Sequence, residues 1–418
     1  MRGFSTGGAC GVDLDPPQVP HYEEDYYEIG RDKRLLARRS GLDVEEEMKF
    51  SVVQEHLARG LSVVGHGVAS RNTLPILSNV YIGTEDGGLR LVATNLEIAV
   101  THWVPAKIEE KGATTIPARL FSDVVNGLPN EKIDIELLAD GRAHLKCGRS
   151  ASHLRTTPAD DFPQVGAAGE RVTARITQKA LRAALDSTVF AAAGDEARPI
   201  LTGVLTTFTG EKATFAAADN YRIAVAGAAL AEAAPETNVI VPARAYAELL
   251  RLLTDVDELV EITLTPAKNQ LQFKLGDTML VSRLIDGQFP PFQQVIPTSH
   301  TTKAIIVRDD FLRAVKLAQV VADASAHIVR FAITTEGGGA IDITAAADVG
   351  DHAAHVEAKV EGEGTTIAFN AKYLVDVLSR VEADQFSLEL TGPIAPGLLR
   401  PLDGRDYLHV VMPVRTPS

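Results

Sequence analysis

Apolar residues recur at helical spacing in three separate stretches of the chain, and each stretch predicts an amphipathic helix. The apolar faces comprise Val53, Leu57, Leu61 and Val64 in the first stretch, Leu181, Leu185 and Val189 in the second, and Leu312 and Val315 in the third. Runs of largely apolar residues lie between these stretches, and turn signals such as Asp140-Gly141 and Gly337-Gly338-Gly339 interrupt them. This pattern is typical of antiparallel strands joined by tight turns.

The stretch from 198 to 225 repeats the stretch from 72 to 100. Both contain Pro-Ile-Leu near their start, continue as strand, turn and strand, and close on Ile-Ala-Val. Residues 327–356 keep the plan without the Pro-Ile-Leu signature. A second helix follows each copy, which makes three segments equivalent: Pro117-Ala118-Arg119, Pro242-Ala243-Arg244 and Asn370-Ala371-Lys372. The repeated unit is about 125 residues long, which is enough to bury a core of its own.

The repeat predicts three domains, at residues 48–168, 169–298 and 299–418. Residues 1–47 have neither periodicity nor a counterpart in the repeat, so we expect a disordered segment or a misassigned start. The consecutive glutamates Glu45-Glu46-Glu47 suggest a purine-rich ribosome-binding site in the gene just before Met48. Our hypothesis is therefore that the natural protein begins at Met48.

Charge first argues against a nucleic-acid partner, because the net charge is −14 and phosphate binding needs Lys and Arg. The distribution changes this picture, since each of the six predicted helices carries basic residues opposite its apolar face. A single basic residue at such a place is usually just solvated. The same placement in all three units favours a shared basic surface.

Motifs for catalysis are absent: the sequence has no phosphate-binding loop, no His-Glu-x-x-His and no Gly-x-Ser-x-Gly. Asp160-Asp161 precedes one Phe-Pro turn, but only one carboxylate, Asp286, precedes the equivalent turn of the second unit. We expect no catalytic residue, cofactor or metal, and we expect Cys10 and Cys147 to be reduced thiols without a role. With 45% hydrophobic residues and no apolar run of ~18 or more, the chain is predicted to be soluble and cytoplasmic.

Several short motifs occur in the order in which the bacterial sliding clamp, the beta subunit of DNA polymerase III, has them. They are Met48-Lys49-Phe50, Thr73-Leu74-Pro75-Ile76-Leu77, Thr115 to Arg119, the two Phe-Pro turns and the closing segment Val410 to Arg415. Residues 48–418 resemble this family. The resemblance implies an α+β fold of three tandem clamp domains, each with two helices packed on two antiparallel sheets. It also implies a head-to-tail dimeric ring of six domains, with the helices facing the hole.

The function implied by the resemblance is that of a non-catalytic processivity factor that encircles duplex DNA and tethers the replicative polymerase. No 3′–5′ exonuclease activity is expected. The implied partners are double-stranded DNA without sequence preference, a second copy of the chain, the polymerase III alpha subunit, the clamp loader, and other polymerases and repair proteins that carry short clamp-binding peptides. No membrane partner is implied, and the expected location is the cytoplasm, at the nucleoid during replication.

Carried over position by position, the resemblance implies three sets of site residues. The DNA-facing set is Arg59, Arg71, Arg119, Lys179, Arg182, Arg198, Arg244, Arg251, Arg313, Lys316 and Lys372. The partner-peptide groove is Leu201, Asp219, Asn220, Tyr221, Arg222, Ile223, Pro290, Val295, Asn370, Tyr373, Val410, Val411, Met412, Pro413, Val414 and Arg415. The dimer interface includes Val320 and Val321.

Two other functions stay open from the residues alone. A monomeric peptide-binding adaptor would use the same groove without encircling DNA, and ring closure distinguishes it from a clamp. A small-molecule enzyme would use the groove as an active site and would need clustered titratable groups there, whereas the groove residues are mainly apolar.

Overall fold

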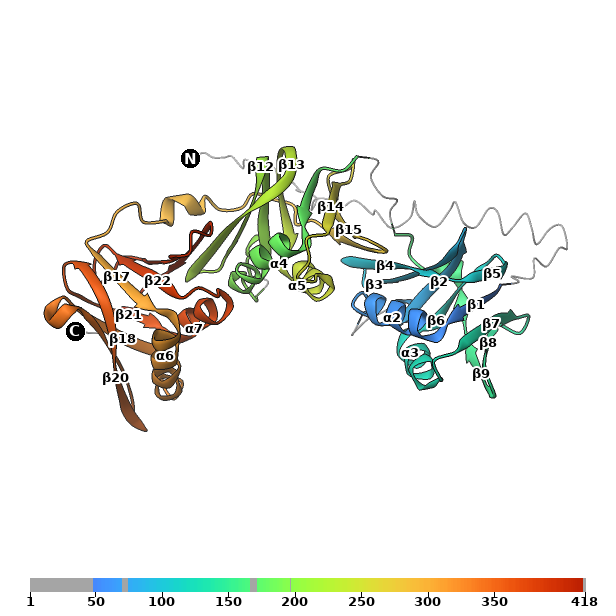
Figure 1. Cartoon of the computed structure of the whole chain (residues 1–418), viewed down its shortest axis with the longest axis horizontal. Coiled ribbons are helices and arrows are strands. Elements are labelled where there is room, and N and C mark those ends of the chain that lie inside the picture. Colours follow the sequence, from blue (N-terminus) through green and yellow to red (C-terminus); the bar gives the residue numbers. More distant parts are fainter. Residues whose placement is uncertain (1–47, 70–73, 166–170, 196, 416–418) are drawn as a thin grey trace, which may run out of the picture.

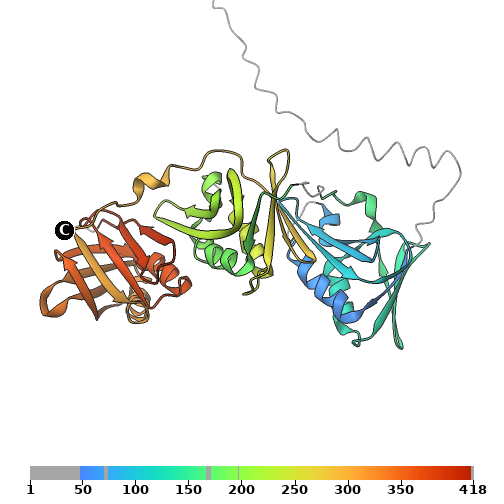
Figure 2. The same cartoon turned by 45° about the horizontal axis from the view of Figure 1, so that its top comes forward.

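The chain folds as an arc of three domains. A computed structural model describes residues 48–69, 74–165, 171–195 and 197–415. The domains follow one another along the arc, the first in blue and cyan and the third in orange and red (Figure 1), and the turned view keeps the same order (Figure 2). The expectations for residues 1–47 and for Arg71 lie outside the described residues.

The first domain places two helices against its strands. The helices are α2 (Gln54–Gly65) and α3 (Ala118–Gly127). The strands are β1 (Lys49–Val53), β2 (Asn79–Glu85), β3 (Gly88–Thr94), β4 (Ile98–Pro105), β5 (Lys107–Glu110), β6 (Ala113–Pro117), β7 (Lys132–Leu138), β8 (Arg142–Cys147), β9 (Ser150–Arg155) and β10 (Thr157–Pro158). Short 3-10 turns are η1 (Pro75–Ser78) and η2 (Ala159–Asp161).

The apolar face predicted for the first helix is confirmed except at its start. Leu57, Leu61 and Val64 are buried, whereas Val53 is 43% exposed. Val53 is the last residue of β1 and precedes α2, so its side chain follows the alternation of the strand rather than the helical spacing. Gly60 lets α2 pack closely on the sheet, because a Cβ there would lie 2.7 Å from Val104.

The second domain repeats this plan. Its helices are α4 (Gln178–Asp186) and α5 (Ala243–Leu252). Its strands are β11 (Ala174–Thr177), β12 (Gly203–Ala218), β13 (Arg222–Pro242), β14 (Leu259–Leu264), β15 (Gln270–Leu275) and β16 (Thr278–Arg283), with 3-10 turns η3 (Val189–Ala191), η4 (Pro199–Thr202) and η5 (Phe292–Val295). Helix α4 ends before Val189, which lies half-buried in η3, so the predicted helical face is three residues too long.

The third domain has the same two helices and a longer hairpin. The helices are α6 (Arg308–Ala322) and α7 (Ala371–Arg380). The strands are β17 (Thr302–Val307), β18 (Ile328–Thr334), β19 (Ala340–Ala347), β20 (Gly350–Gly362), β21 (Thr365–Asn370), β22 (Gln385–Leu390), β23 (Gly397–Pro401) and β24 (Tyr407–Val411), with the 3-10 turn η6 (Glu336–Gly338). On α6, Val315 is buried and Leu312 is half-buried, as their spacing predicted.

The strands form three antiparallel sheets, and two of these run from one domain into the next. A nine-stranded sheet crosses from the first domain to the second where β4 pairs with β16, a contact that we call the first joint. A ten-stranded sheet crosses from the second domain to the third where β13 pairs with β24, the second joint. The third sheet, β5-β1-β7-β8-β9, belongs to the first domain. Strand pairing therefore crosses both joints, through two different sheets.

Candidate functional site

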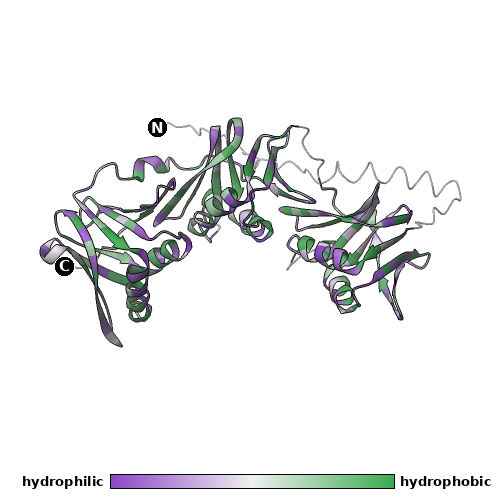
Figure 3. Cartoon of the chain, in the orientation of Figure 1, coloured by the Kyte–Doolittle hydropathy of each residue, from purple (hydrophilic) through white to green (hydrophobic). Residues whose placement is uncertain are grey.

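The six helices of the described part of the chain lie along the concave side of the arc, and strands β12 and β13 lie on the convex side (Figure 1). Hydropathy varies along each of these helices, with hydrophilic residues beside hydrophobic ones (Figure 3). An amphipathic helix turns its apolar residues to the core and its polar residues to solvent. The concave side is therefore where the polar residues of all three domains meet solvent.

Every described member of the predicted DNA-facing set is exposed. Nine of these residues are on the helices: Arg59 on α2, Arg119 on α3, Lys179 and Arg182 on α4, Arg244 and Arg251 on α5, Arg313 and Lys316 on α6, and Lys372 on α7. Arg198 precedes η4. Lys372 is in the first turn of α7, beside Asn370 and Tyr373 of the predicted groove, so it lies at the edge of the second joint.

Some of these cations have carboxylate neighbours. Arg119 Nε lies 4.0 Å from Asp123 Oδ2, and Arg313 Nη1 lies 3.8 Å from Asp310 Oδ1. Exposed pairs of this kind contribute little free energy, about 0.2–1 kcal/mol. The arginines can therefore exchange these neighbours for a phosphate.

The second joint has an apolar floor. Three predicted groove residues, Leu201, Ile223 and Val410, belong to one buried cluster with Phe289 and Phe292. Val411 is also fully buried. These side chains form the buried apolar floor of the second joint.

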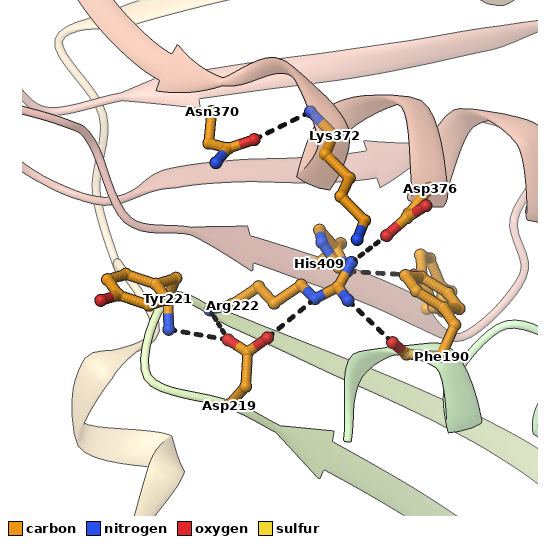
Figure 4. Close-up of polar contacts among 9 residues, drawn as sticks. Phe190, Asp219, Tyr221, Arg222, Asn370, Lys372, Asp376 and His409 are labelled. Carbon is orange, nitrogen blue, oxygen red and sulfur yellow. Dashed lines mark hydrogen bonds and ion pairs between the residues drawn. The ribbon is translucent and has the colours of Figure 1, made fainter. Parts of the chain in front are cut away.

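Arg222 holds the two domains together at this floor. Its side chain is only 9% exposed. The guanidinium donates to Asp219 Oδ2 at 3.1 Å and to the backbone oxygen of Phe190 at 2.9 Å, both in the second domain. It also pairs with Asp376 of α7 at 2.5 Å, across the joint (Figure 4). The sequence placed Arg222 in the groove, and the structure shows that its charge is already satisfied within the protein.

Two tyrosines border the Arg222 cluster. The Tyr221 ring stacks on the Tyr373 ring, with centroids 5.9 Å apart, and Tyr221 is 55% exposed. Asp219 fixes the turn below them by accepting hydrogen bonds from the backbone N–H groups of Tyr221 and Arg222. Burial, together with the nearby Asp219 carboxylate, raises the pKa of Tyr373. An exposed tyrosine stacked on a half-buried one, next to buried apolar side chains, suits the apolar side chains of a short peptide.

The segment from Met412 to Val414 packs along the second joint. The backbone N–H of Met412 donates to the carbonyl of Tyr221 at 2.8 Å, and that of Val414 donates to the carbonyl of Ala368 at 2.8 Å. Met412, Pro413 and Val414 are half-buried. These bonds tie the segment to both domains.

Of the other predicted groove residues, one is a helix cap and four are exposed. Asn370 caps α7, since its Oδ1 accepts from the backbone N–H of Lys372 at 3.0 Å. Asn220, Pro290, Val295 and Arg415 are exposed. Neither Pro290 nor Val295 belongs to the buried cluster of the floor.

The sequence missed three residues of the second joint: Phe190, Asp376 and His409. The guanidinium of Arg222 lies 5.3 Å from the centre of the Phe190 ring, and the His409 ring stacks on Phe190 with centroids 5.7 Å apart. Burial lowers the pKa of His409 to about 3, and the Arg222 charge acts in the same direction. Asp376 could have been found, because it follows Tyr373 by three residues and therefore lies on the same side of α7.

The residues predicted for the dimer interface differ in exposure. Val320 on α6 is 72% exposed, whereas Val321 is half-buried against the core of its own domain. Leu317, one turn before, is 53% exposed and was not predicted. Val320 and Leu317 give the end of α6 a small apolar surface. In the first domain, the edge strand β9 carries the half-buried Ser152.

Within the described residues, no group of three His, Cys, Asp or Glu side chains is arranged to hold a metal ion. None of the described helices has the length and apolar character needed to cross a bilayer.

Comparison with known families and proteins gives consistent matches. Three models of the DNA polymerase III beta subunit match the chain: the N-terminal domain at residues 48–166, the central domain at 175–291 and the C-terminal domain at 293–415. The beta sliding clamp of Synechococcus elongatus is 33% identical over 89% of this chain and 100% of its own length. That of Vibrio cholerae is 31% identical over 88% of this chain and 100% of its own length.

Solved structures agree. The crystal structure of the Bacillus subtilis DNA polymerase sliding clamp is similar with a TM-score of 0.85 and 28% identity, covering 89% of this chain and 100% of that one. A Pseudomonas aeruginosa clamp bound to griselimycin is similar with a TM-score of 0.81 and 31% identity, covering 88% of this chain and 100% of that one.

Proposed function

This chain belongs to the DNA polymerase III beta subunit family, the bacterial sliding clamps, and from this membership we propose how its surfaces divide the work of a clamp. It is a processivity factor and a non-catalytic subunit of the polymerase. As a member of the family it encircles DNA as a homodimeric ring and works with a DNA polymerase. The assignment of residues to these tasks is our proposal.

The concave helices are the DNA-facing surface in this proposal. The observation that carries it is that exposed basic side chains from all three domains lie on helices of one concave side. We assign the contacts with DNA phosphates to the ten exposed basic residues described above and to Arg71. Phosphate contacts without base readout bind weakly, with dissociation constants on the order of 10⁻⁴ to 10⁻⁶ M. A closed ring needs no tighter binding, because it is linked around the duplex and can slide along it.

Ring closure involves the end of α6 and the edge of the first domain. Val320 and the neighbouring Leu317 are exposed apolar side chains, which supports a contact that buries them. In the head-to-tail dimer we assign their contact to the first domain of the other copy. Val321, half-buried in its own domain, supports this surface from beneath.

The second joint is the partner site. We assign it to short peptides of the polymerase III alpha subunit, the clamp loader, and other polymerases and repair proteins. The exposed Tyr221, stacked on the half-buried Tyr373 beside an Arg222 whose charge is neutralised, supports an apolar peptide. Binding a polymerase to a ring on the DNA raises its effective concentration at the primer end. Because the DNA that it encircles is the chromosome, we place the protein in the cytoplasm, at the nucleoid during replication.

Retention on DNA tests the proposal. The full chain is loaded by its clamp loader onto a nicked circular plasmid and onto the same plasmid after linearisation, and both are washed in high salt. We expect retention on the circle and loss from the linear form, because only topology resists salt. Equal loss from both would contradict ring closure on DNA and would support a monomeric adaptor.

A further inference from the structure

A pocket of about 570 Å³ opens among α4, α5 and α7 at the centre of the arc. Its polar lining includes Arg182 and Arg251 of the second domain, Arg380 of the third and His66 of the first. We infer that this pocket holds one backbone phosphate of the encircled DNA between the three arginines. The inference rests on the proposed function. It adds Arg380 and His66 to the DNA-facing residues and assigns one phosphate to a defined pocket.

The three guanidinium groups are held in place by the protein. Arg182 Nη1 donates to the carbonyls of Leu250 and Leu253, at 3.1 and 2.6 Å. Arg380 Nη1 donates to Asp186 Oδ1 at 3.1 Å. Each guanidinium has five N–H donors, so these bonds orient the group and leave donors for a ligand. An oriented fork loses less entropy on binding phosphate than a mobile side chain does.

The third arginine has a similar support. Arg251 Nη1 lies 3.2 Å from Glu248 Oε2, and His66 Nδ1 lies 3.1 Å from the same oxygen. The charged groups at the pocket are therefore three guanidinium groups and the carboxylates of Asp186 and Glu248. The balance is positive even with His66 neutral, so the pocket favours an anion.

The floor of the pocket is apolar. Val189, Phe190, Ala247 and Leu250 form it. The Arg380 guanidinium lies 5.7 Å from the centre of the Phe190 ring, so this arginine borders the floor directly. Apolar surroundings reduce solvent screening and strengthen the attraction between a guanidinium and an anion. A phosphate that carries an apolar deoxyribose fits this combination better than a free inorganic ion does.

The number of arginines per phosphate separates this pocket from the rest of the concave side. Three guanidinium groups around one pocket neutralise one phosphate together. Arg119, Arg244 and Arg313 are on three different helices and outside the pocket lining, so each of them would meet a phosphate of its own. The salt dependence of DNA binding counts neutralised phosphates, at about 0.9 in the log–log slope for each.

The test uses the full chain and a short linear duplex, with equilibrium binding measured by fluorescence anisotropy over a series of salt concentrations. Two triple variants are compared: Arg182→Gln, Arg251→Gln and Arg380→Gln in the pocket, and Arg119→Gln, Arg244→Gln and Arg313→Gln as the control. We expect the pocket variant to lower the slope by about 0.9 per pocket and the control by about 2.7 per chain. Single pocket variants should weaken binding while leaving the slope nearly unchanged.

A pocket variant that lowers the slope as much as the control would overturn the inference, because the arginines would then contact separate phosphates. A pocket variant with no effect beside an effective control would also overturn it. If wild-type binding itself has no salt dependence, the proposed DNA-facing surface fails instead. A triple variant with lysines in the pocket keeps the charge and should restore the slope, while thermal unfolding checks that each variant is folded.

Discussion

The two joints are built on the same repeated stretch, yet of the two aligned charged residues only the one at the second joint is buried. At the first joint the sequence is Leu96-Glu97-Ile98, and at the second it is Tyr221-Arg222-Ile223. In both, the isoleucine is buried and the residue two positions before it is exposed. Glu97 is exposed, whereas Arg222 is buried among Asp219, Asp376 and Phe190.

The first joint is a strand pairing within one sheet, between β4 and β16. A hollow of about 200 Å³ lies there, lined in part by Leu96, Glu97, Pro163 and Arg283. Leu96 adopts a φ of 74°, which is unfavourable for a branched side chain, and its turn is held by the side chains of Thr94 and Asn95. The charged residues Glu97 and Arg283 both remain exposed. This hollow is small and has charged residues in its lining, so it is poorly suited to an apolar peptide.

The next domain makes the difference at the second joint. Helix α7 supplies Tyr373 and Asp376, which stack on Tyr221 and pair with Arg222. Strand β24, which forms the joint with β13, is followed by Met412, whose backbone N–H donates to the carbonyl of Tyr221. At the first joint, the strand β16 continues into the linker to the third domain. The two joints therefore differ because α7 and the segment after β24 add residues to the repeated motif only at the second joint.

Removing the Arg222 charge should have the largest effect. Arg222→Met leaves Asp219 and Asp376 partly buried without their cation, so we expect the second joint to lose about 3 kcal/mol. The matched change at the first joint, Glu97→Met, removes an exposed charge and should cost less than about 0.5 kcal/mol. Urea unfolding measures both losses.

Fluorescence separates the joints in this experiment. Trp103, the only tryptophan, donates its backbone N–H to Asp277 across the first joint at 2.9 Å. A Tyr221→Trp substitution in a Trp103→Phe background reports on the second joint. Equal shifts of the urea midpoint for Arg222→Met and Glu97→Met would refute the difference between the joints.

Acid should weaken the second joint before the first. His409 has a pKa of about 3 in the folded protein, because burial and then the Arg222 charge oppose protonation, against an ordinary value of 6.5. The unfolded chain therefore takes up this proton at higher pH. The neutral His409 side chain makes its full contribution to the free energy of unfolding above pH 6.5. Below that, the free energy of unfolding falls by about 1.4 kcal/mol per pH unit as the pH drops toward 3.

His102 is the matched residue at the first joint. Burial lowers its pKa, but the Asp277 carboxylate opposes this shift, and Nδ1 lies 2.9 Å from Thr278 Oγ1. We expect His409→Phe to remove most of the acid sensitivity at the second joint and His102→Phe to change little. The measurement is the urea midpoint at each reporter between pH 7 and pH 4.5. Unchanged acid sensitivity in His409→Phe would show that other groups control it.

The helix cap at the second joint should give the smallest effect. Asn370 caps α7 through its side chain, whereas Pro242, at the equivalent place before α5, makes no such bond. Asn370→Ala should cost about 1 kcal/mol. Amide hydrogen exchange in the first turn of α7 measures this loss, with Lys372 as the probe. Unchanged protection there would mean that the cap contributes nothing to the helix.

The repeat in the sequence predicted most of the architecture, because the same apolar spacing recurs in each unit. The helical faces of α2, α4 and α6 followed from that spacing, apart from the end residues Val53 and Val189. Spacing does not report where a strand stops and a helix begins, and both of these residues lie at such borders. The six helices and the antiparallel strands were therefore predictable.

The contacts inside the second joint were harder to predict from the sequence. Leu201, Ile223 and Val410 were predicted as groove residues, but in the structure they are buried together with Phe289 and Phe292 from the linker. Phe190 and His409 appear as ordinary core residues in a sequence. Their contacts arise only when two separately folded domains meet.

Peptide binding at the two joints tests the central claim most directly. The probe is a fluorescently labelled clamp-binding peptide of the polymerase III alpha subunit, and the variants are Tyr221→Ala and Leu96→Ala, which change equivalent exposed residues. We expect Tyr221→Ala to weaken binding by about 2 kcal/mol, roughly 30-fold, as loss of a central aromatic contact does. Leu96→Ala should leave the affinity unchanged. Equal loss in both variants, or loss only in Leu96→Ala, would contradict the assignment of the partner site to the second joint.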